Sequence, residues 1–175
     1  MKPPHAAHAA SSNTATHAGD GQGSAMNHYP RFAAMIVVSF VVMFGLMYVM
    51  VDRFAHVLSN LNQVYMAALM AGAMVLIELA FMGAMYPNAK LNGLFLAVAL
   101  IIVGVSWFGV RYQWGIGDTQ FLRSMIPHHA GAILMCEEAT IASSEIRALC
   151  GEIQRSQRAE ILQMEALLAA ERQRQ

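Results

Sequence analysis

The stretch LNGLFLAVALIIVGVSWFGV, residues 91–110, holds 20 consecutive positions without a charged side chain. Two similar runs precede it: residues 33–51 hold 19 positions without a charge, and residues 64–86 hold 23 with Glu78 as their single charge. About 20 apolar residues in a helix cross the hydrocarbon core of a bilayer. Three such runs, joined by short polar links, predict three transmembrane helices and a lipid bilayer as their surroundings.

The composition of the whole chain agrees with a membrane location. Of its 175 residues, 57% are hydrophobic and 13% are charged, which is far from the average soluble domain. The formal net charge is zero and no basic cluster occurs, so nothing indicates nucleic acid as a partner. Of the 22 charged residues, 14 lie in 118–175, which separates a polar C-terminal region from an apolar region upstream.

The first 25 residues differ from both regions. They consist mainly of Ala, Ser, Thr, Gly and His without apolar periodicity, which predicts a disordered tail. Its histidines (His5, His8 and His17) can bind divalent metals loosely, although spacers in low-complexity sequence are the commoner explanation. The predicted organisation is therefore a tail over 1–25, a three-helix membrane domain over 26–112 and a separate unit over 118–172.

Residues 118–172 show the periodicity of two amphipathic helices. The first is expected over about 118–141 and the second over about 143–170, with a serine at 143 or 144 as its cap. Pro127 lies inside the first helix and removes the amide that would bond to the carbonyl of Arg123. The predicted fold class is all-α, with three transmembrane helices followed by an amphipathic two-helix hairpin.

The first hairpin helix carries an unusual set of metal donors on one face. At 100° per residue, this face includes Met125, His128, His129, Met135 and Cys136. Thioether, thiol and imidazole groups are soft or borderline donors, which suit copper and Cu(I) in particular. The alternative for two adjacent histidines is one core residue and one exposed residue, each hydrogen-bonded.

Two polar side chains, Gln157 and Glu160, interrupt the apolar stripe of the second helix, which also includes Met164. This stripe is expected to face the first helix. A buried carboxylate without a partner is costly, so Glu160 is expected to lie opposite a cation or an imidazolium. Cys136 and Cys150 are expected at similar heights in the hairpin. A disulfide, a pair of soft ligands and two small buried hydrophobes all stay open for them.

The membrane region is rich in methionine. Met66, Met70 and Met74 recur every four residues on one face of the second span, and Met43, Met47 and Met50 lie in the first. Glu78 is an ionisable residue within a span, which costs about 2.5–3.5 kcal/mol on insertion scales and suggests a functional site. Methionine as an adaptable packing residue is the simpler explanation of the stripe.

Two elements of the hairpin resemble a known family. They are Phe121-Leu122-Arg123-Ser124-Met125-Ile126-Pro127-His128-His129-Ala130-Gly131-Ala132-Ile133 and the pattern Gln157-x-x-Glu160-Ile161-x-x-Met164. With them, residues 118–168 resemble the domain of unknown function 305 family. Residues 26–110, which open with Met26-Asn27-His28-Tyr29-Pro30-Arg31-Phe32 and hold three spans, resemble its membrane-anchored branch. The resemblance implies a ferritin-like hairpin and copper-binding relatives in the bacterial periplasm or envelope.

By the same resemblance, the metal-site residues are Met125, His128, His129, Met135, Glu160 and Met164. The positions of Cys136, Cys150, Gln157 and Glu78 in the sequence make them additional candidates. This chain departs from the family in its N-terminal extension, in Thr140, where many relatives carry histidine, and in Cys150, where alanine is usual.

These observations predict a membrane-anchored copper-binding protein of the bacterial envelope, not an enzyme, for copper tolerance, buffering or handover. Cu(I) is favoured, and Cu(II) is possible through the histidines and Glu160. The alternative is a small copper transporter with a methionine-lined path in the second span. A ferritin-like oxidase needs several inward carboxylates, whereas only Glu160 is expected to face inward.

Three spans place the two ends of the chain on opposite sides of a membrane. Basic residues near the spans number three on each side, so their distribution barely fixes the orientation. Arg31, directly before the first span, favours a cytoplasmic N-terminus and a periplasmic or external hairpin at the inner membrane. A hairpin of about 55 residues has little core of its own, so a homo-oligomer is expected.

Overall fold

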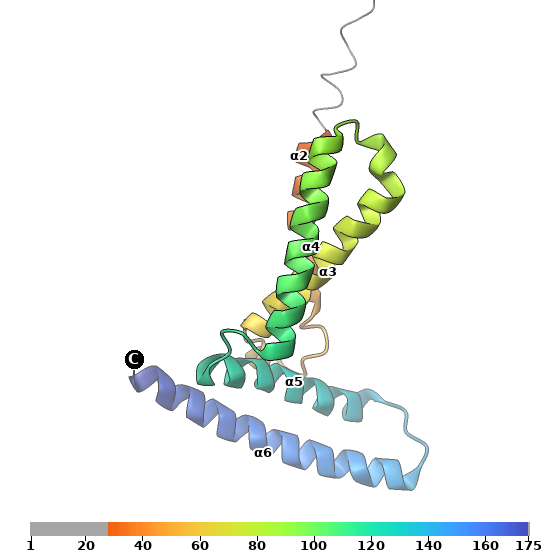
Figure 1. The fold of residues 1–175 in the computed structure, drawn as a ribbon. Helices are drawn as coiled ribbons and strands as arrows, with labels where there is room; N and C mark the ends of the chain where they lie inside the picture. The colour runs from red at the N-terminus through yellow and green to blue at the C-terminus, as the bar shows by residue number, and fades with distance from the viewer. Residues whose placement is uncertain (1–27, 175) are drawn as a thin grey trace, which may run out of the picture.

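The computed structural model describes residues 28–174 and places the chain in two parts (Figure 1). Three helices form a stalk, and two further helices lie side by side across one end of it. In chain order the elements are α2 (His28–Leu46), η1 (Phe54–His56), α3 (Leu61–Met82), η2 (Gly83–Met85), α4 (Ala89–Tyr112), α5 (Asp118–Glu138) and α6 (Ser144–Arg174). The predicted tail over 1–25 lies outside the described residues.

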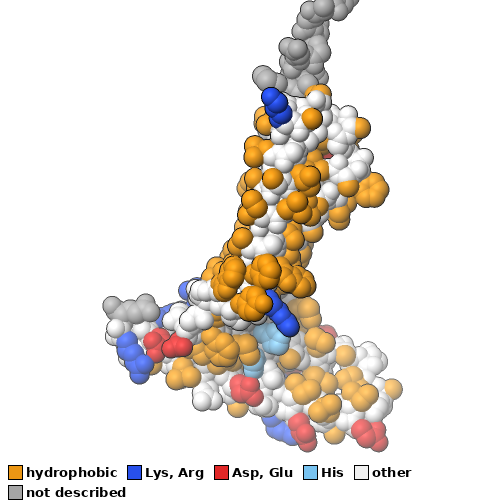
Figure 2. Space-filling view, in the orientation of Figure 1, with side chains coloured by type: hydrophobic (Ala, Val, Ile, Leu, Met, Phe, Trp, Pro, Cys, Tyr) orange, Lys and Arg blue, Asp and Glu red, His pale blue; other side chains and the backbone are white. Residues whose placement is uncertain are grey.

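The helices α2, α3 and α4 are each long and apolar enough to cross a membrane. Large apolar side chains cover their outer surface, as Figure 2 shows along the stalk, and Phe81, Ile101 and Val37 are all more than half exposed. Such a surface matches lipid and not water. We call residues 28–112 the membrane domain; its all-helical character and three span-length helices confirm the predicted fold class.

Helix ends in the membrane domain differ from the predicted spans. The first predicted span covers 33–51, whereas α2 begins at His28 and ends at Leu46, before a turn over 47–50. The early start has a side-chain cause, because Tyr29 is buried and its hydroxyl bonds to the side chain of Asn92 at 2.9 Å. Between α3 and α4 the packing is close: a Cβ on Gly72 would lie 2.8 Å from Val103.

The two C-terminal helices, α5 and α6, form the predicted hairpin. Their shared core contains Leu122, Ile126, Ala130, Ile133, Ile161, Met164 and Leu168. The first helix is three residues shorter than predicted because Ala139 is already extended (φ −72°, ψ 131°). The second begins as predicted, with Ser143 accepting the amide of Ile146 at 3.3 Å, and continues to Arg174, four residues beyond the predicted end.

Pro127 explains how the hairpin attaches to the membrane domain. It leaves the carbonyl of Arg123 without its partner in α5, and the side-chain amide of Asn60 donates to that carbonyl at 3.3 Å. Asn60 is buried and also caps α3 by accepting the amide of Gln63 at 3.0 Å. Nearby, the amide of Leu61 donates to Gln120 at 2.9 Å. The start of α3 therefore holds the start of α5.

Candidate metal site

The adjacent histidines of α5 point in different directions. His129 is buried and faces α6, whereas His128 is exposed and faces the membrane domain. Their ring centroids lie 6.1 Å apart, with an angle of 63° between the ring planes. This separation divides the predicted metal-site residues into two groups, one on each side of α5. Figure 2 shows histidine side chains where the stalk meets the hairpin.

The first group lines a cavity of about 520 Å³ between α5 and the membrane domain. From α5 it receives Met125, His128 and Met135. From the membrane domain it receives Met47, Met50 and Met66, at the end of the first span and the start of the second. Since Met50 is 48% exposed and Met135 is 59% exposed, the cavity opens to the surface instead of being sealed.

The remaining lining of this cavity is neutral. Its polar members are Asn60, Asn62, Gln63 and Ser124, and no Asp or Glu lines it. Elsewhere in residues 28–174, no three His, Cys, Asp or Glu side chains lie close enough to share a metal ion. Five thioethers and one imidazole therefore form the richest donor set in the described part of the chain, and thioethers select soft ions.

The second group is built around His129, whose two ring nitrogens both have partners. Nδ1 lies 2.9 Å from the carbonyl oxygen of Met125, and Nε2 lies 2.8 Å from the carboxylate of Glu160. A carbonyl and an ionised carboxylate can only accept hydrogen bonds, so a ring nitrogen that carries a proton donates it to its partner. Hydrogen bonds from Ser156, and then from His129, hold the pKa of Glu160 below its ordinary value. Glu160 pairs with an imidazole as predicted, but its expected burial is wrong, because its side chain is 47% exposed at the edge of the hairpin.

Other candidates lie away from the cavity. Met164 is buried in the hairpin core, and Gln157 is partly buried one turn before Glu160. Glu78 is near the opposite end of α3, where it accepts a hydrogen bond from Tyr86 at 3.4 Å. Of the methionine stripe in α3, Met66 alone reaches the cavity. Met70 is 41% exposed, and Met74, also on α3, does not line the cavity.

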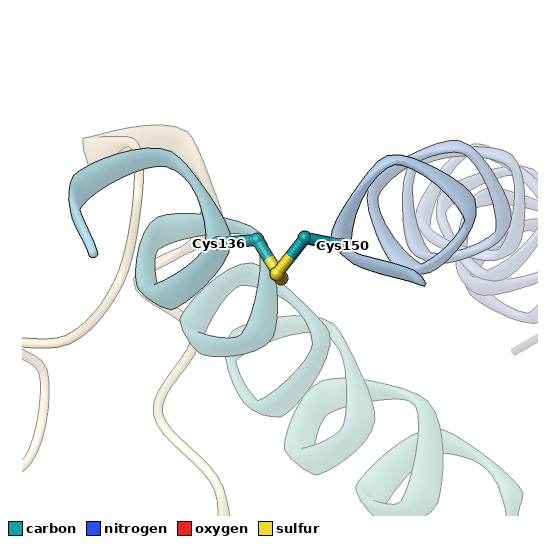
Figure 3. The surroundings of a disulfide bond; sticks show 2 residues. All are labelled: Cys136 and Cys150. Carbon is teal, nitrogen blue, oxygen red and sulfur yellow. A yellow bond between two sulfur atoms is a disulfide. The ribbon is translucent and has the colours of Figure 1, made fainter. Parts of the chain in front are cut away.

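The two cysteines form a disulfide, with Cα atoms 5.3 Å apart (Figure 3). Of the three alternatives that the sequence leaves open, this one holds. The bond joins the end of α5 to the start of α6 across a sequence separation of 14 residues. Closing a loop of that length stabilises a fold by about 3 kcal/mol in the chain-entropy description. As a disulfide, Cys136 and Cys150 supply no thiolate for a metal.

Comparison with known proteins identifies the hairpin. Residues 118–175 match the family described as Domain of unknown function (DUF305). An uncharacterized protein of Acanthamoeba polyphaga mimivirus is 31% identical over 137 residues, which cover 77% of this chain and 88% of that protein. This chain belongs to the DUF305 family. No solved structure matches it.

The viral relative of this DUF305 protein is similar to more than the hairpin. Its match is over twice as long as residues 118–175, so it extends well into the membrane domain.

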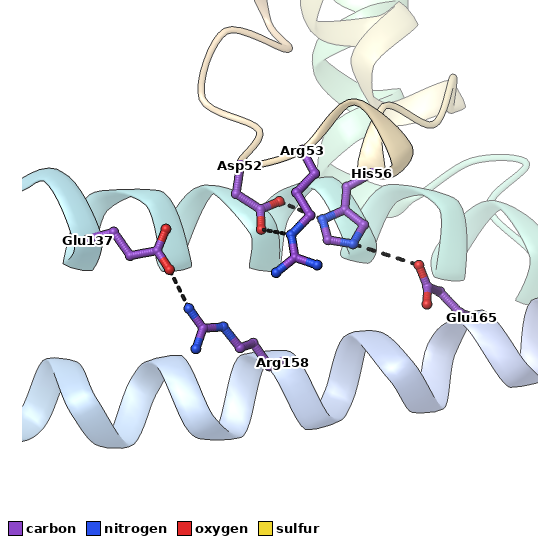
Figure 4. A network of polar contacts seen from close by, with 6 residues as sticks. All are labelled: Asp52, Arg53, His56, Glu137, Arg158 and Glu165. Carbon is purple, nitrogen blue, oxygen red and sulfur yellow. Dashed lines mark hydrogen bonds and ion pairs between the residues drawn. The ribbon is translucent and has the colours of Figure 1, made fainter.

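A polar cluster that the sequence did not predict lies on the other side of the junction (Figure 4). His56 is buried, with Nδ1 2.5 Å from Asp52 and Nε2 3.7 Å from Glu165 of α6. Arg158 of α6 pairs with Glu137 of α5. The contact of His56 with Glu165 joins the 51–60 segment to α6, and the pair of Arg158 with Glu137 joins the two hairpin helices of this DUF305 protein.

Met47, Met50 and Met66 are the cavity residues that sequence reasoning did not connect to the hairpin. The number of spans could have predicted this connection. After three spans, the hairpin lies on the same side as the link between the first two, which is where these methionines are. The order of the three spans alone therefore predicts that these methionines lie on the same side of the membrane as Met125 and His128.

Proposed function

We propose that this chain is a membrane-anchored copper-binding protein of the bacterial cell envelope, serving copper tolerance, buffering or handover without catalysing a reaction. The observation that carries the proposal is the convergence of Met125, His128 and Met135 on one open cavity. These are three of the six residues that the family resemblance assigns to the metal site.

The chemistry of the lining supports Cu(I) in particular. Thioether sulfur is a soft donor, and imidazole is a borderline donor that copper accepts readily. Magnesium, calcium and manganese prefer carboxylate and carbonyl oxygens, which this lining offers only as neutral amides. Cu(II) is better served on the other side of α5 by His129 and Glu160, where the ion would displace the proton that now joins them.

The disulfide supports an external hairpin. Disulfides persist in the periplasm and outside the cell but are rare in the cytosol. The predicted orientation, with a cytoplasmic N-terminus and three spans, places Cys136 and Cys150 in such a compartment. The bacterial inner membrane is the location that the family resemblance implies.

A homo-oligomer stays part of the proposal. Several large apolar side chains of the hairpin are about half exposed or more, among them Ile146, Leu149 and Leu162. A second hairpin packed against this surface would give a four-helix, ferritin-like arrangement. Cross-linking in native membranes, followed by mass measurement, tests this part independently of metal binding.

Transport is the second candidate, and one observation favours it. Met66 belongs both to the cavity and to the stripe that continues through Met70 and Met74 along α3. A path from the cavity into the membrane would use that stripe. Flux of copper into vesicles that contain the reconstituted protein, slowed by Met70→Leu with Met74→Leu but unchanged in equilibrium binding, would support transport over buffering.

The adjacent histidines supply a matched test of the proposed function. Full-length protein in lipid nanodiscs is titrated with Cu(I) against a chromophoric chelator, beside His128→Ala and His129→Ala. Loss of a donor should weaken binding at least about tenfold, since even residues behind the ligands are worth 10–100-fold. We expect that loss for His128→Ala and a change below about twofold for His129→Ala. Wild-type protein that binds no Cu(I) would refute the proposal.

A further inference from the structure

We propose that the metal site is shared between the two domains, with methionines of the membrane domain completing the donors of α5. The six candidate donors, from which one Cu(I) ion takes at most four, are Met47, Met50 and Met66 on one side of the cavity and Met125, His128 and Met135 on the other. This inference rests on the proposed function and deepens it, because it makes Cu(I) binding a property of the junction and not of the hairpin alone.

Exposure argues against a pure packing role for these methionines. A methionine that fills a gap in a core has its sulfur surrounded by apolar atoms. Met50 and Met135 are instead about half exposed on opposite walls of an open cavity, beside the polar side chains of Asn60 and Asn62. Leucine or a polar residue would serve a surface position equally well, so the repeated choice of thioether fits the ligation of a soft ion.

The two walls face one another because other contacts hold them. Asn60 binds the carbonyl of Arg123, and the side-chain amide of Asn62 lies 3.4 Å from the hydroxyl of Ser124. Across the cavity floor, a Cβ added to Gly131 would lie 3.5 Å from the carbonyl oxygen of Met50, so α5 approaches the 47–51 turn closely. These contacts bring the donors together before any metal arrives, which lowers the ordering cost of binding.

Methionine suits a site assembled in this way. Its unbranched side chain has three rotatable bonds, so sulfur atoms from both walls can close around one ion inside a cavity of about 520 Å³. A bound Cu(I) would then link the membrane domain to α5. Because a ligand that binds only the docked arrangement stabilises it, copper should also strengthen the attachment of the hairpin.

The test compares two triple variants of the full-length protein in nanodiscs. In the first, the cavity methionines of the membrane domain are replaced (Met47→Leu, Met50→Leu and Met66→Leu). In the control, three methionines of α2 and α3 that do not line the cavity are replaced (Met43→Leu, Met70→Leu and Met74→Leu). Cu(I) affinity should fall at least about tenfold in the first and change less than about twofold in the control.

A structural readout accompanies the titration. X-ray absorption at the copper edge counts sulfur neighbours of the bound ion, and the cavity triple should show fewer than the wild type and the control. Circular dichroism and thermal unfolding confirm that both triples keep the helical fold.

The outcomes separate this inference from the proposed function. If His128→Ala weakens binding while the cavity triple retains wild-type affinity and sulfur count, the shared site is refuted and the hairpin alone binds copper. If the wild type binds no Cu(I), or His128→Ala has no effect, the proposed function itself fails. Equal losses in both triples would also overturn the shared site, since the effect would not depend on the cavity.

Discussion

The two faces of α5 present their histidines to different surroundings. Toward α6, His129 is buried, both of its ring nitrogens lie within 2.9 Å of an acceptor, and Met164 of α6 fills the core between the two helices. Toward the membrane domain, His128 and Met135 are exposed in a cavity, and the ring of His128 has no hydrogen-bond partner within residues 28–174. Neighbouring histidines in a sequence are thus not evidence of a shared site, because a helix turns them apart by 100°.

The largest effect on this comparison should come from the disulfide, which belongs to the α6 side. Replacing Cys136 and Cys150 with serine is expected to lower the stability of the hairpin by about 3 kcal/mol. Thermal unfolding followed by circular dichroism measures this. If the cavity face is independent, Cu(I) affinity measured well below the unfolding transition stays near the wild-type value; a large loss of affinity would mean that the two faces are coupled.

Asn60 tests the opposite face, because its side chain both caps α3 and binds the carbonyl of Arg123. Asn60→Ala should cost about 2 kcal/mol, from the lost cap and the lost hydrogen bond to α5. Asn60→Ser is the matched control, since serine caps helices well but is too short to reach Arg123. Hydrogen exchange in α5 should increase in both variants, whereas exchange at the start of α3 should increase only in the alanine variant.

The histidines should also differ in their contribution to stability. His129→Ala removes a buried ring and its hydrogen bond to the carbonyl of Met125, and should destabilise the hairpin by about 1 kcal/mol. His128→Ala changes an exposed residue and should stay within about 0.5 kcal/mol of the wild type. Chemical denaturation of the metal-free protein measures both values, and equal values would contradict the assignment of the two faces.

The smallest expected effect concerns acid. Because the pKa of Glu160 is lowered by Ser156 and His129, its ionised form stabilises the folded state. This contribution is complete above the ordinary glutamate pKa and is lost as the pH falls through the lowered value. The difference in stability between the wild type and Glu160→Gln should therefore shrink as the pH falls below about 4. A difference that grew on acidification would exclude this pairing.

Much of the fold follows from patterns that short-range physics explains. The uncharged runs predict the three span-length helices, and the apolar stripe predicts the hairpin, including its start after Ser143. The helix ends were less accurate. Tyr29 extends α2 through a bond to Asn92 from α4, and this is a tertiary contact that no local pattern contains.

The site was only half predictable for a related reason. Periodicity assigned Glu160 to the inner face of α6, and His129 lies opposite it at 2.8 Å. Periodicity could not show which of His128 and His129 faces α6 and which faces the membrane domain, because one broad face of α5 contacts both. Met50 and Met66 enter the site through packing between domains, where the order of the chain gives topology but not distance.

The shape of the molecule limits how copies can be arranged in a membrane. With 31 residues, α6 is about 46 Å long, which exceeds the width of three packed helices of about 10 Å diameter each. It lies across the end of the stalk, as the crossbar of a T (Figure 1). Neighbouring copies approaching along that direction would therefore collide through their hairpins while lipid still separated their spans. The crossbar thus sets a minimum spacing along its length, and only its narrow sides permit denser crowding.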